Sequence, residues 1–380
     1  MGTKVVVAPD KFKGTLGAES VARAIGDGVK RAIPDAQVIL VPMADGGEGT
    51  LDALVAASGG KRHGVVVTGP LGESIKAEIG ILTDGTAVIE MAKASGFSLV
   101  SPEKRDPMVT TTFGTGEMIE AGLDLRCARF IIGIGGSATC DAGIGAAQAL
   151  GVRILKEDGS PVGLGGSELI KIAHIDLSTI DPRLKGKQFL IASDVKNPLY
   201  GPHGAAHVFA PQKGAGPEEV IQLDQGLIHF SRIVKRDLGV DVSEMPGGGA
   251  AGGLGAGLVA FLGAAIRPGV DLVIDTVDLR GKLQDADLVI TGEGQIDRQS
   301  VYGKVPVGVA RLAKQLAIKV TAIAGRLGDG YQEVQAVGVD TIYSLELIAG
   351  SVEEAMQNPA PYIESAAFTA TKTLLVKNHR

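Results

Sequence analysis

Apolar runs and amphipathic segments alternate regularly near the beginning of the chain. Residues 4–8 and 37–41 are short runs rich in β-branched side chains, which favour strands. Between them, residues 18–32 repeat apolar side chains at the spacing of a helix. Residues 50–57 predict a second helix, which is closed by a pair of glycines. Strand–helix–strand units of this length predict a parallel sheet with right-handed crossovers.

The same alternation returns in the last quarter of the chain. Apolar runs predict strands at residues 287–291, 319–324 and 340–344. A helix is predicted at residues 307–316, and a long closing helix is predicted from Ser351 onward. Because the two ends resemble each other, we expect them to form one discontinuous domain.

The middle of the chain has a different pattern. Strand-like runs occur at residues 64–68, 74–82, 86–90, 129–134 and 189–193. The first three are joined by short turns, which predict hairpins and therefore antiparallel or mixed pairing. The predicted fold class is α/β with two domains. Residues 1–64 plus 285–380 would form a parallel-sheet domain, and residues 65–284 an inserted domain with a mixed sheet.

Composition narrows the functional classes. The chain has 380 residues with 37 basic and 43 acidic side chains, so its net charge is −6. This balance disfavours a general nucleic-acid binder, which needs a basic face for the phosphates. Aromatic residues make up 4% of the chain, which disfavours base-stacking surfaces. The two cysteines cannot form a disulfide framework or a four-thiolate zinc site.

No targeting or membrane segment is expected. The apolar run at the N-terminus is too short for a signal peptide, which makes the cytoplasm the expected location. Residues 245–266 carry no charge, but 8 of them are glycine and 6 are alanine. We therefore expect a glycine loop that enters a buried helix, not a membrane span.

Glycine accounts for 55 residues, and many of these lie in four segments beside predicted strand ends or helix starts. The four segments are residues 44–50, 133–141, 247–255 and 291–297. Ligands of open α/β sheets collect at the carboxyl ends of strands, and glycine turns before helices present N–H groups to anions. Three of the four segments also contain Asp or Glu. The pattern predicts a site that handles phosphate.

Two nucleotide signatures give different answers. The P-loop signature Gly-x-x-x-x-Gly-Lys-Ser/Thr is absent from the sequence. Gly133-x-Gly135-x-x-Ala138 matches the dinucleotide fingerprint, although the carboxylate of Asp141 would repel a pyrophosphate there. A nicotinamide-dependent dehydrogenase of a small hydroxy acid is therefore one alternative. A non-catalytic regulator that binds a sugar acid is another.

Carboxylates close to phosphates usually hold Mg²⁺, which prefers oxygen ligands. The candidates are Asp45, Glu48, Asp141, Asp194, Glu293 and Asp297, each of which could instead be a helix cap or turn residue. Among them, Asp194 follows an apolar strand and is the strongest single candidate. The complementary cations are Lys11, Lys13, Lys213 and Lys304, which could bind a carboxylate or phosphate or lie in solvated loops.

Taken in order, these segments resemble the bacterial glycerate kinase family over essentially the whole chain. The resemblance rests on residues 8–14 (APDKFKG), 42–50 (PMADGGEGT), 132–141 (IGIGGSATCD), 209–215 (FAPQKGA) and 288–297 (LVITGEGQID). The sequence departs from the family pattern at Lys11, where serine is usual, and at Cys140, where asparagine is usual. Asp141 is retained, and the additional cation at Lys11 could alter substrate preference.

The resemblance implies ATP-dependent phosphorylation of D-glycerate with Mg²⁺, giving 2-phosphoglycerate or 3-phosphoglycerate. It also implies a flavodoxin-like domain from both termini and a restriction-enzyme-like inserted domain.

As a hypothesis, we assign roles to the candidate residues. The expected catalytic residues are Asp194, Lys13 and Asp45. Lys13, Gly46, Gly47 and Lys11 are expected to bind the substrate, and Gly135, Gly136, Ser137, Gly252, Gly253 and Lys304 to bind the nucleotide. The expected metal ligands are Asp194, Asp141, Glu293 and Asp297.

Overall fold

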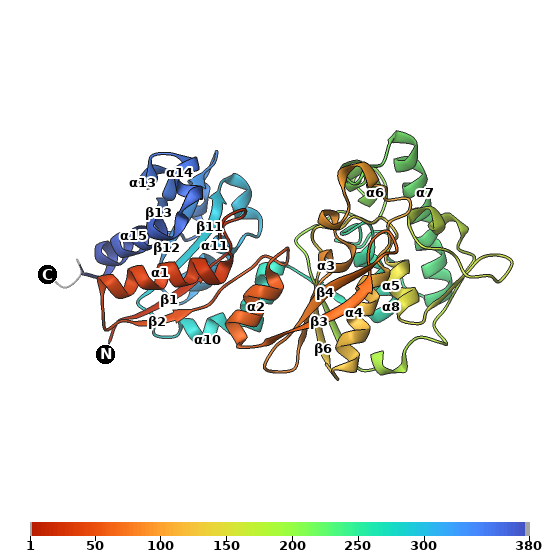
Figure 1. Ribbon diagram of the computed structural model, residues 1–380, viewed down its shortest axis with the longest axis horizontal. Helices are drawn as coiled ribbons and strands as arrows, with labels where there is room; N and C mark the ends of the chain where they lie inside the picture. The colour runs from red at the N-terminus through yellow and green to blue at the C-terminus, as the bar shows by residue number, and fades with distance from the viewer. Residues whose placement is uncertain (1, 377–380) are drawn as a thin grey trace. The chain divides into compact units, whose positions relative to one another are not determined.

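A computed structural model describes residues 2–376, within which the chain forms two compact units (Figure 1). The terminal unit comprises the chain up to Asp45, residues Asp52–Gly60 and the chain from Pro268 onward. The central unit comprises Gly46–Leu51 and Lys61–Arg267. The predicted α/β class, with one parallel and one mixed sheet, is confirmed.

The terminal unit is built on a parallel sheet. Its strands are β1 (Lys4–Pro9), β2 (Gln37–Leu40), β11 (Leu288–Ile296), β12 (Lys319–Leu327) and β13 (Thr341–Ser344). Their order in the sheet is β13-β12-β11-β1-β2, and all neighbours are parallel. Numbered along this unit the order is 2-1-3-4-5, which is flavodoxin-like. Strand order reverses between β1 and β11, where folds of this type bind their ligands.

The terminal unit also contains helices of different lengths. They are α1 (Ala18–Ala32), α2 (Thr50–Ser58), α9 (Gly269–Thr276), α10 (Leu279–Leu283), α11 (Val305–Gln315), α12 (Glu333–Ala336), α13 (Leu345–Ala349), α14 (Val352–Gln357) and α15 (Pro359–Thr371), with the shorter turns η6 (Arg298–Tyr302) and η7 (Lys372–Val376). The red α1 and the blue α15 lie side by side and share one apolar core with β1 and β11 (Figure 1). Gly28 permits this approach, because a Cβ there would lie 2.3 Å from the carbonyl oxygen of Glu364.

Two predicted elements differ from the structure. The closing helix is divided into α14 and α15, because Pro359 cannot continue a helix and restricts Asn358 before it. The glycine segment 291–297 is not a turn after a strand, since β11 extends to Ile296. Its glycines serve close packing between strands: a Cβ on Gly325 of β12 would lie 2.4 Å from the carbonyl oxygen of Gly294.

The central unit contains a mixed six-stranded sheet and a two-stranded one. The strands are β3 (Lys61–Thr68), β4 (Ser74–Ile81), β5 (Ala87–Glu90), β6 (Arg129–Gly133), β7 (Arg153–Leu155), β8 (His174–Asp176), β9 (Gln188–Ala192) and β10 (Ala265–Arg267). The larger sheet has the order β10-β9-β6-β5-β4-β3. Its β3–β4 and β4–β5 pairs are antiparallel, as the hairpin turns predict, and its other pairs are parallel.

Helices of the central unit vary greatly in length. They are α3 (Ala92–Ser95), α4 (Phe113–Asp124), α5 (Ile144–Ala149), α6 (Ala205–Phe209), α7 (Pro217–Leu238) and α8 (Leu254–Leu262), with the 3-10 turns η1 (Phe97–Leu99), η2 (Pro102–Lys104), η3 (Gly166–Lys171), η4 (Pro182–Leu184) and η5 (Pro211–Lys213). The 22-residue α7 is not among the predicted elements, although it buries Leu223, Leu227 and Val234 on one face. Residues 247–253 form the expected glycine loop before the buried α8. Across residues 2–376, no helix combines the length and the apolar character needed to cross a membrane.

The unit boundaries lie away from the expected positions at residues 64/65 and 284/285. The second boundary is at Pro268, because α9 packs against α11 within the terminal unit. Near the first boundary, residues 46–51 belong to the central unit. The backbone N–H of Leu51 donates to the buried Glu90 carboxylate at the end of β5 (2.9 Å), which ties this segment to the central sheet.

Candidate active site

Two carboxylates lie at the switch point of the terminal unit. Asp10 directly follows β1 and is 6% exposed, while Glu293 lies within the neighbouring β11 and is 8% exposed. The backbone N–H of Asp10 donates to the carbonyl of Gly292 (2.8 Å), which fixes Asp10 beside β11. Asp45 is electrostatically coupled to both groups. The sequence analysis selected Glu293 and Asp45 but not Asp10.

Burial changes the pKa values of Asp10 and Glu293. It raises the pKa of Asp10 to about 8, and repulsion from Asp45 adds to the effect. Burial also raises the pKa of Glu293 to about 7, although the ion pair with Lys304 (2.5 Å) acts in the opposite direction. The second carboxylate oxygen of Glu293 is buried without a hydrogen-bond partner in the described part of the chain. An additional cation would therefore be favourable here.

These pKa values predict how stability depends on pH. Folding raises the pKa of Asp10 and Glu293, so the folded state binds more protons than the unfolded state at intermediate pH. The stabilisation is complete below about pH 4 and is lost as the pH rises through the folded values. We expect the free energy of unfolding to fall by on the order of 1 kcal/mol per pH unit between these limits. Urea unfolding at pH 5 and pH 8 measures this change. In Asp10→Asn, the difference in the free energy of unfolding between the two pH values should be smaller than in the wild type. An equal difference in the variant and the wild type would show that Asp10 does not cause it.

The predicted substrate lysines lie beyond β1, at the same end of the terminal sheet. The side chain of Lys13 is exposed. Its backbone lies close to β11, because a Cβ added to Gly294 would be 3.1 Å from the backbone nitrogen of Lys13. Lys11 is partly buried, and its backbone N–H donates to the Asp10 carboxylate (2.6 Å). Lys304 pairs with Glu293. Burial alone would lower the pKa of Lys304, but the Glu293 carboxylate outweighs it and raises that pKa.

Asp297 occupies a capping position in the terminal unit. One carboxylate oxygen accepts from the backbone N–H of Gln299 at the start of η6 (2.8 Å). The other accepts from the side-chain amide of Gln295 (2.7 Å). These contacts make Asp297 a helix cap, the other role that the sequence allowed, and its metal ligation stays a prediction.

In the central unit, three of the glycine segments meet. A Cβ on Gly133 would lie 2.6 Å from the carbonyl oxygen of Gly46, and one on Gly135 would lie 3.3 Å from the Cα of Gly47. A Cβ on Gly252 would lie 2.0 Å from the carbonyl oxygen of Thr139. The predicted substrate turn and the predicted phosphate loop are therefore neighbours, and their missing side chains allow the backbones to touch.

These glycines differ in accessibility. Gly135 and Gly136 are exposed at the end of β6, and Gly136 has a left-handed φ of +75°. Gly252 and Gly253 are buried against residues 139–142, and the carbonyl of Gly252 accepts from the N–H of Ala142 (3.0 Å). The structure thus gives Gly252 and Gly253 a packing role in place of the predicted nucleotide contact, and leaves Gly135, Gly136 and Ser137 as the candidate phosphate loop.

Asp141 is fully buried behind this loop. Its carboxylate accepts from the N–H and hydroxyl of Thr112 (both 2.8 Å) and from the N–H of Gly143 (3.1 Å). Burial raises the pKa of Asp141, and these hydrogen bonds oppose that shift. The carboxylate joins the start of α4 to the turn before α5, a structural role in place of the predicted metal ligation.

Removing this carboxylate should destabilise the protein. Asp141→Ala leaves three buried donors without an acceptor, so we expect the free energy of unfolding to fall by about 2–4 kcal/mol. Chemical denaturation measures the effect, with Asp158→Ala at an exposed turn as the control. Equal stability of the two variants would show that the Asp141 hydrogen bonds contribute nothing.

Asp194 lies two residues beyond β9, in the central unit. It is exposed, and β9 is the parallel neighbour of β6, with Ala192 paired to Gly133. The segments after these two residues leave the same edge of the sheet, the edge at which the Gly135–Ser137 loop also begins. Asp194 and Asp141 belong to the central unit, whereas Glu293 and Asp297 belong to the terminal unit. Within residues 2–376, no three His, Cys, Asp or Glu side chains are grouped closely enough to hold a metal by themselves.

The dinucleotide fingerprint lacks its structural context. In a dinucleotide fold the glycine turn leads directly into a helix whose N-terminus faces the pyrophosphate. Here α5 begins only at Ile144, six residues after Ala138. The buried carboxylate of Asp141 stands between them. Gly133-x-Gly135-x-x-Ala138 is therefore no evidence for a nicotinamide site.

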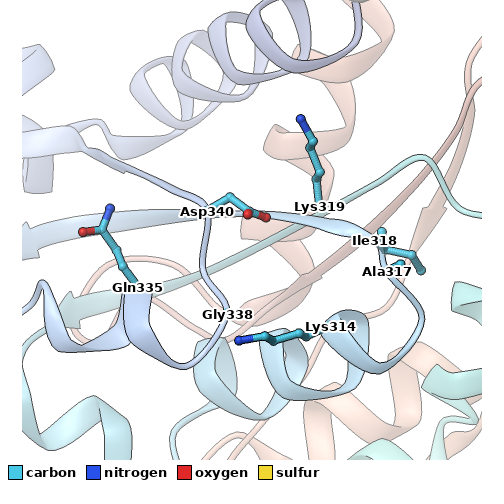
Figure 2. A pocket seen from close by; sticks show the side chains of 7 residues that line it. All are labelled: Lys314, Ala317, Ile318, Lys319, Gln335, Gly338 and Asp340. Atoms are coloured by element: carbon cyan, nitrogen blue, oxygen red, sulfur yellow. The ribbon is translucent and has the colours of Figure 1, made fainter.

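A surface pocket of about 290 Å³ occurs elsewhere in the terminal unit (Figure 2). It is lined by Lys314, Ala317, Ile318, Lys319, Gln335, Gly338 and Asp340. Lys319 begins β12 and Asp340 directly precedes β13, so the pocket borders the amino ends of these strands. The carboxylates lie at the opposite end of the parallel sheet, and the pocket is therefore not part of the candidate site.

Comparison with known proteins decides the family. The sequence model of the glycerate kinase family matches residues 5–375. The chain belongs to the glycerate kinase family. It is 51% identical to a glycerate kinase of Halalkalibacterium halodurans, with 96% of each chain covered, and 47% identical to the glycerate 2-kinase of Escherichia coli, with 98% covered. A crystal structure described as glycerate kinase 2 from Salmonella typhimurium LT2 matches with a TM-score of 0.92, 44% identity and full coverage of both chains.

Family membership confirms the resemblance seen in the sequence, and the protein is an enzyme, a glycerate kinase. Its kinase chemistry implies ATP as co-substrate. One residue of interest in this glycerate kinase, Asp10, escaped the sequence analysis. Asp10 belongs to the APDKFKG motif, which carried the only signal for it, whereas Lys213 was named as a candidate cation but was given no role in the site.

Proposed function

We propose that this glycerate kinase transfers the γ-phosphoryl group of ATP to the 2-hydroxyl of D-glycerate with Mg²⁺. The observation that carries the choice of hydroxyl is the 47% identity, over 98% of both chains, to a relative named glycerate 2-kinase. Transfer to the 3-hydroxyl is the competing outcome of the test.

The terminal unit has the chemistry that an anionic substrate and a metal require. Lys13 and Lys11 would bind the carboxylate of glycerate as point charges. Glu293 would hold Mg²⁺ together with Asp45, because one buried Glu293 oxygen has no hydrogen-bond partner among the described residues. Mg²⁺ commonly uses one or two carboxylates and completes its shell with water and phosphate oxygens, so a third protein ligand is not required. When bound, it would neutralise charge on the phosphates.

The central unit has the chemistry that a phosphate chain requires. The exposed Gly135 and Gly136, followed by Ser137, would present N–H and hydroxyl donors to phosphate oxygens. Asp194, which follows the neighbouring strand β9, would orient or deprotonate the substrate hydroxyl.

A coupled assay of ADP release tests the proposal. D-glycerate, L-glycerate and related hydroxy acids are compared as substrates, with and without Mg²⁺. Phosphorus NMR of the product distinguishes 2-phosphoglycerate from 3-phosphoglycerate. We expect ADP release with D-glycerate, 2-phosphoglycerate as product and loss of activity in excess EDTA. A 3-phosphoglycerate signal, or full activity in EDTA, would refute the corresponding part of the proposal.

A further inference from the structure

Lys213 is a buried cation in the central unit. Its side chain is 3% exposed at the end of η5, and the following Gly214 has a φ of +106°. A Cβ on Gly214 would lie 2.0 Å from the carbonyl oxygen of Arg105, so this turn is packed tightly against its neighbour. The lysine is therefore held in the interior of the unit.

Among residues 2–376, the ammonium group of Lys213 has hydrogen bonds but forms no ion pair. Its Nζ donates to the hydroxyl of Ser137 (2.7 Å) and to the carbonyl of Thr139 (2.6 Å). No carboxylate lies within 4.0 Å of it in the described part of the chain. Burial lowers the pKa of Lys213 to about 8, while Cys140 and Asp141 oppose that shift. Burying a charge without an ion-pair partner destabilises the folded state. A lysine at such a position is therefore a candidate for a role in function.

Ser137 connects this cation to the candidate phosphate loop. The backbone on both sides of it is fixed, because Phe97 donates to the carbonyl of Gly136 (2.8 Å) and Ala138 donates to the carbonyl of Ser95 (2.9 Å). A lysine ammonium is only a donor, so the Ser137 oxygen must accept from it. The hydroxyl hydrogen of Ser137 is then directed away from Lys213, and no acceptor for it occurs among residues 2–376.

We propose that Lys213 is a positioning residue that acts through Ser137. The ammonium group fixes the Ser137 oxygen and polarises its O–H, which then donates to a phosphate oxygen of ATP beside the Gly135–Gly136 turn. Ser137 is 9% exposed and can therefore reach a ligand that the buried Lys213 does not touch. The inference rests on the proposed function, since it requires ATP at this loop.

Two substitutions and their combination test the inference. Lys213→Met removes the charge at similar length, and Ser137→Ala removes only the hydroxyl. We expect each to raise the KM for ATP about 10-fold or more, since a hydrogen bond to a charged group is lost, while the KM for D-glycerate changes less than about twofold. Because Lys213 acts through Ser137, the double variant should be no worse than the more impaired single variant. Lys213→Arg, which keeps the charge and the donors, should recover part of the loss.

The controls separate the possible failures. Lys185→Met makes the same change at an exposed site and should behave as wild type. If the wild-type protein releases no ADP with D-glycerate, the proposed function fails. If it is active but Ser137→Ala leaves the KM for ATP unchanged, the inference fails, and this holds even where Lys213→Met does not fold. The inference would also fail if the increases in the KM for ATP multiplied in the double variant. Equal increases in the KM for ATP and the KM for D-glycerate would overturn it as well.

Discussion

Asp194→Asn should reduce kcat at least about 100-fold while the protein stays folded, because general-base catalysis contributes roughly that much or more. The side chain is exposed beyond the end of β9, so the fold does not depend on its burial. Asparagine has nearly the same shape but cannot accept a proton or carry the negative charge. The coupled ADP assay measures kcat, and circular dichroism verifies the fold.

The control for this prediction is Asp158→Asn, the same chemical change at an exposed turn of the central unit. Near-normal turnover in Asp194→Asn would remove this residue from the catalytic site. If raising the Mg²⁺ concentration restored the activity of Asp194→Asn, Asp194 would be a metal ligand and not the general base. A loss that Mg²⁺ does not restore supports the role of base.

Local sequence patterns predicted most of the fold. The helix expected at residues 18–32 has these bounds in the structure, because its apolar face is strongly periodic and Pro34 follows closely. The extension of β11 through Gly292 and Gly294 could not be foreseen. Glycine in a sequence indicates a turn, whereas here it permits contact with β12, a long-range relation.

The site was less predictable than the fold, since the same residue types serve packing and chemistry. The rule for strand ends selects Asp194, which follows β9, and Glu293, which lies within β11 beside the carboxyl end of β1. It cannot tell that Asp141 is satisfied by Thr112 and Gly143, or that Gly252 supports a neighbouring backbone. Lys213 looks like part of a solvated turn, and only tertiary packing turns it inward. Burial is the information that a single sequence lacks.

Glu293→Gln should lower kcat about 100-fold or more at ordinary Mg²⁺, because the carboxylate would hold the cations, Mg²⁺ and Lys304, that neutralise the negative charge of the phosphates. Glutamine keeps the size of the side chain but removes the negative charge that pairs with Lys304 and faces Asp45. The variant should remain folded, since burying a neutral amide costs less than burying a charge.

The response to metal makes this prediction specific. If Glu293 holds Mg²⁺, the concentration of Mg²⁺ needed for half-maximal activity should rise about 10-fold or more in Glu293→Gln. Glu353→Gln, an exposed position on α14, makes the same change and should leave the titration unaltered. A fall in kcat with an unchanged Mg²⁺ titration would instead mean that Glu293 acts by holding Lys304. The buried oxygen of Glu293 that has no partner among the described residues favours the first result, because the ion pair with Lys304 uses only the other oxygen.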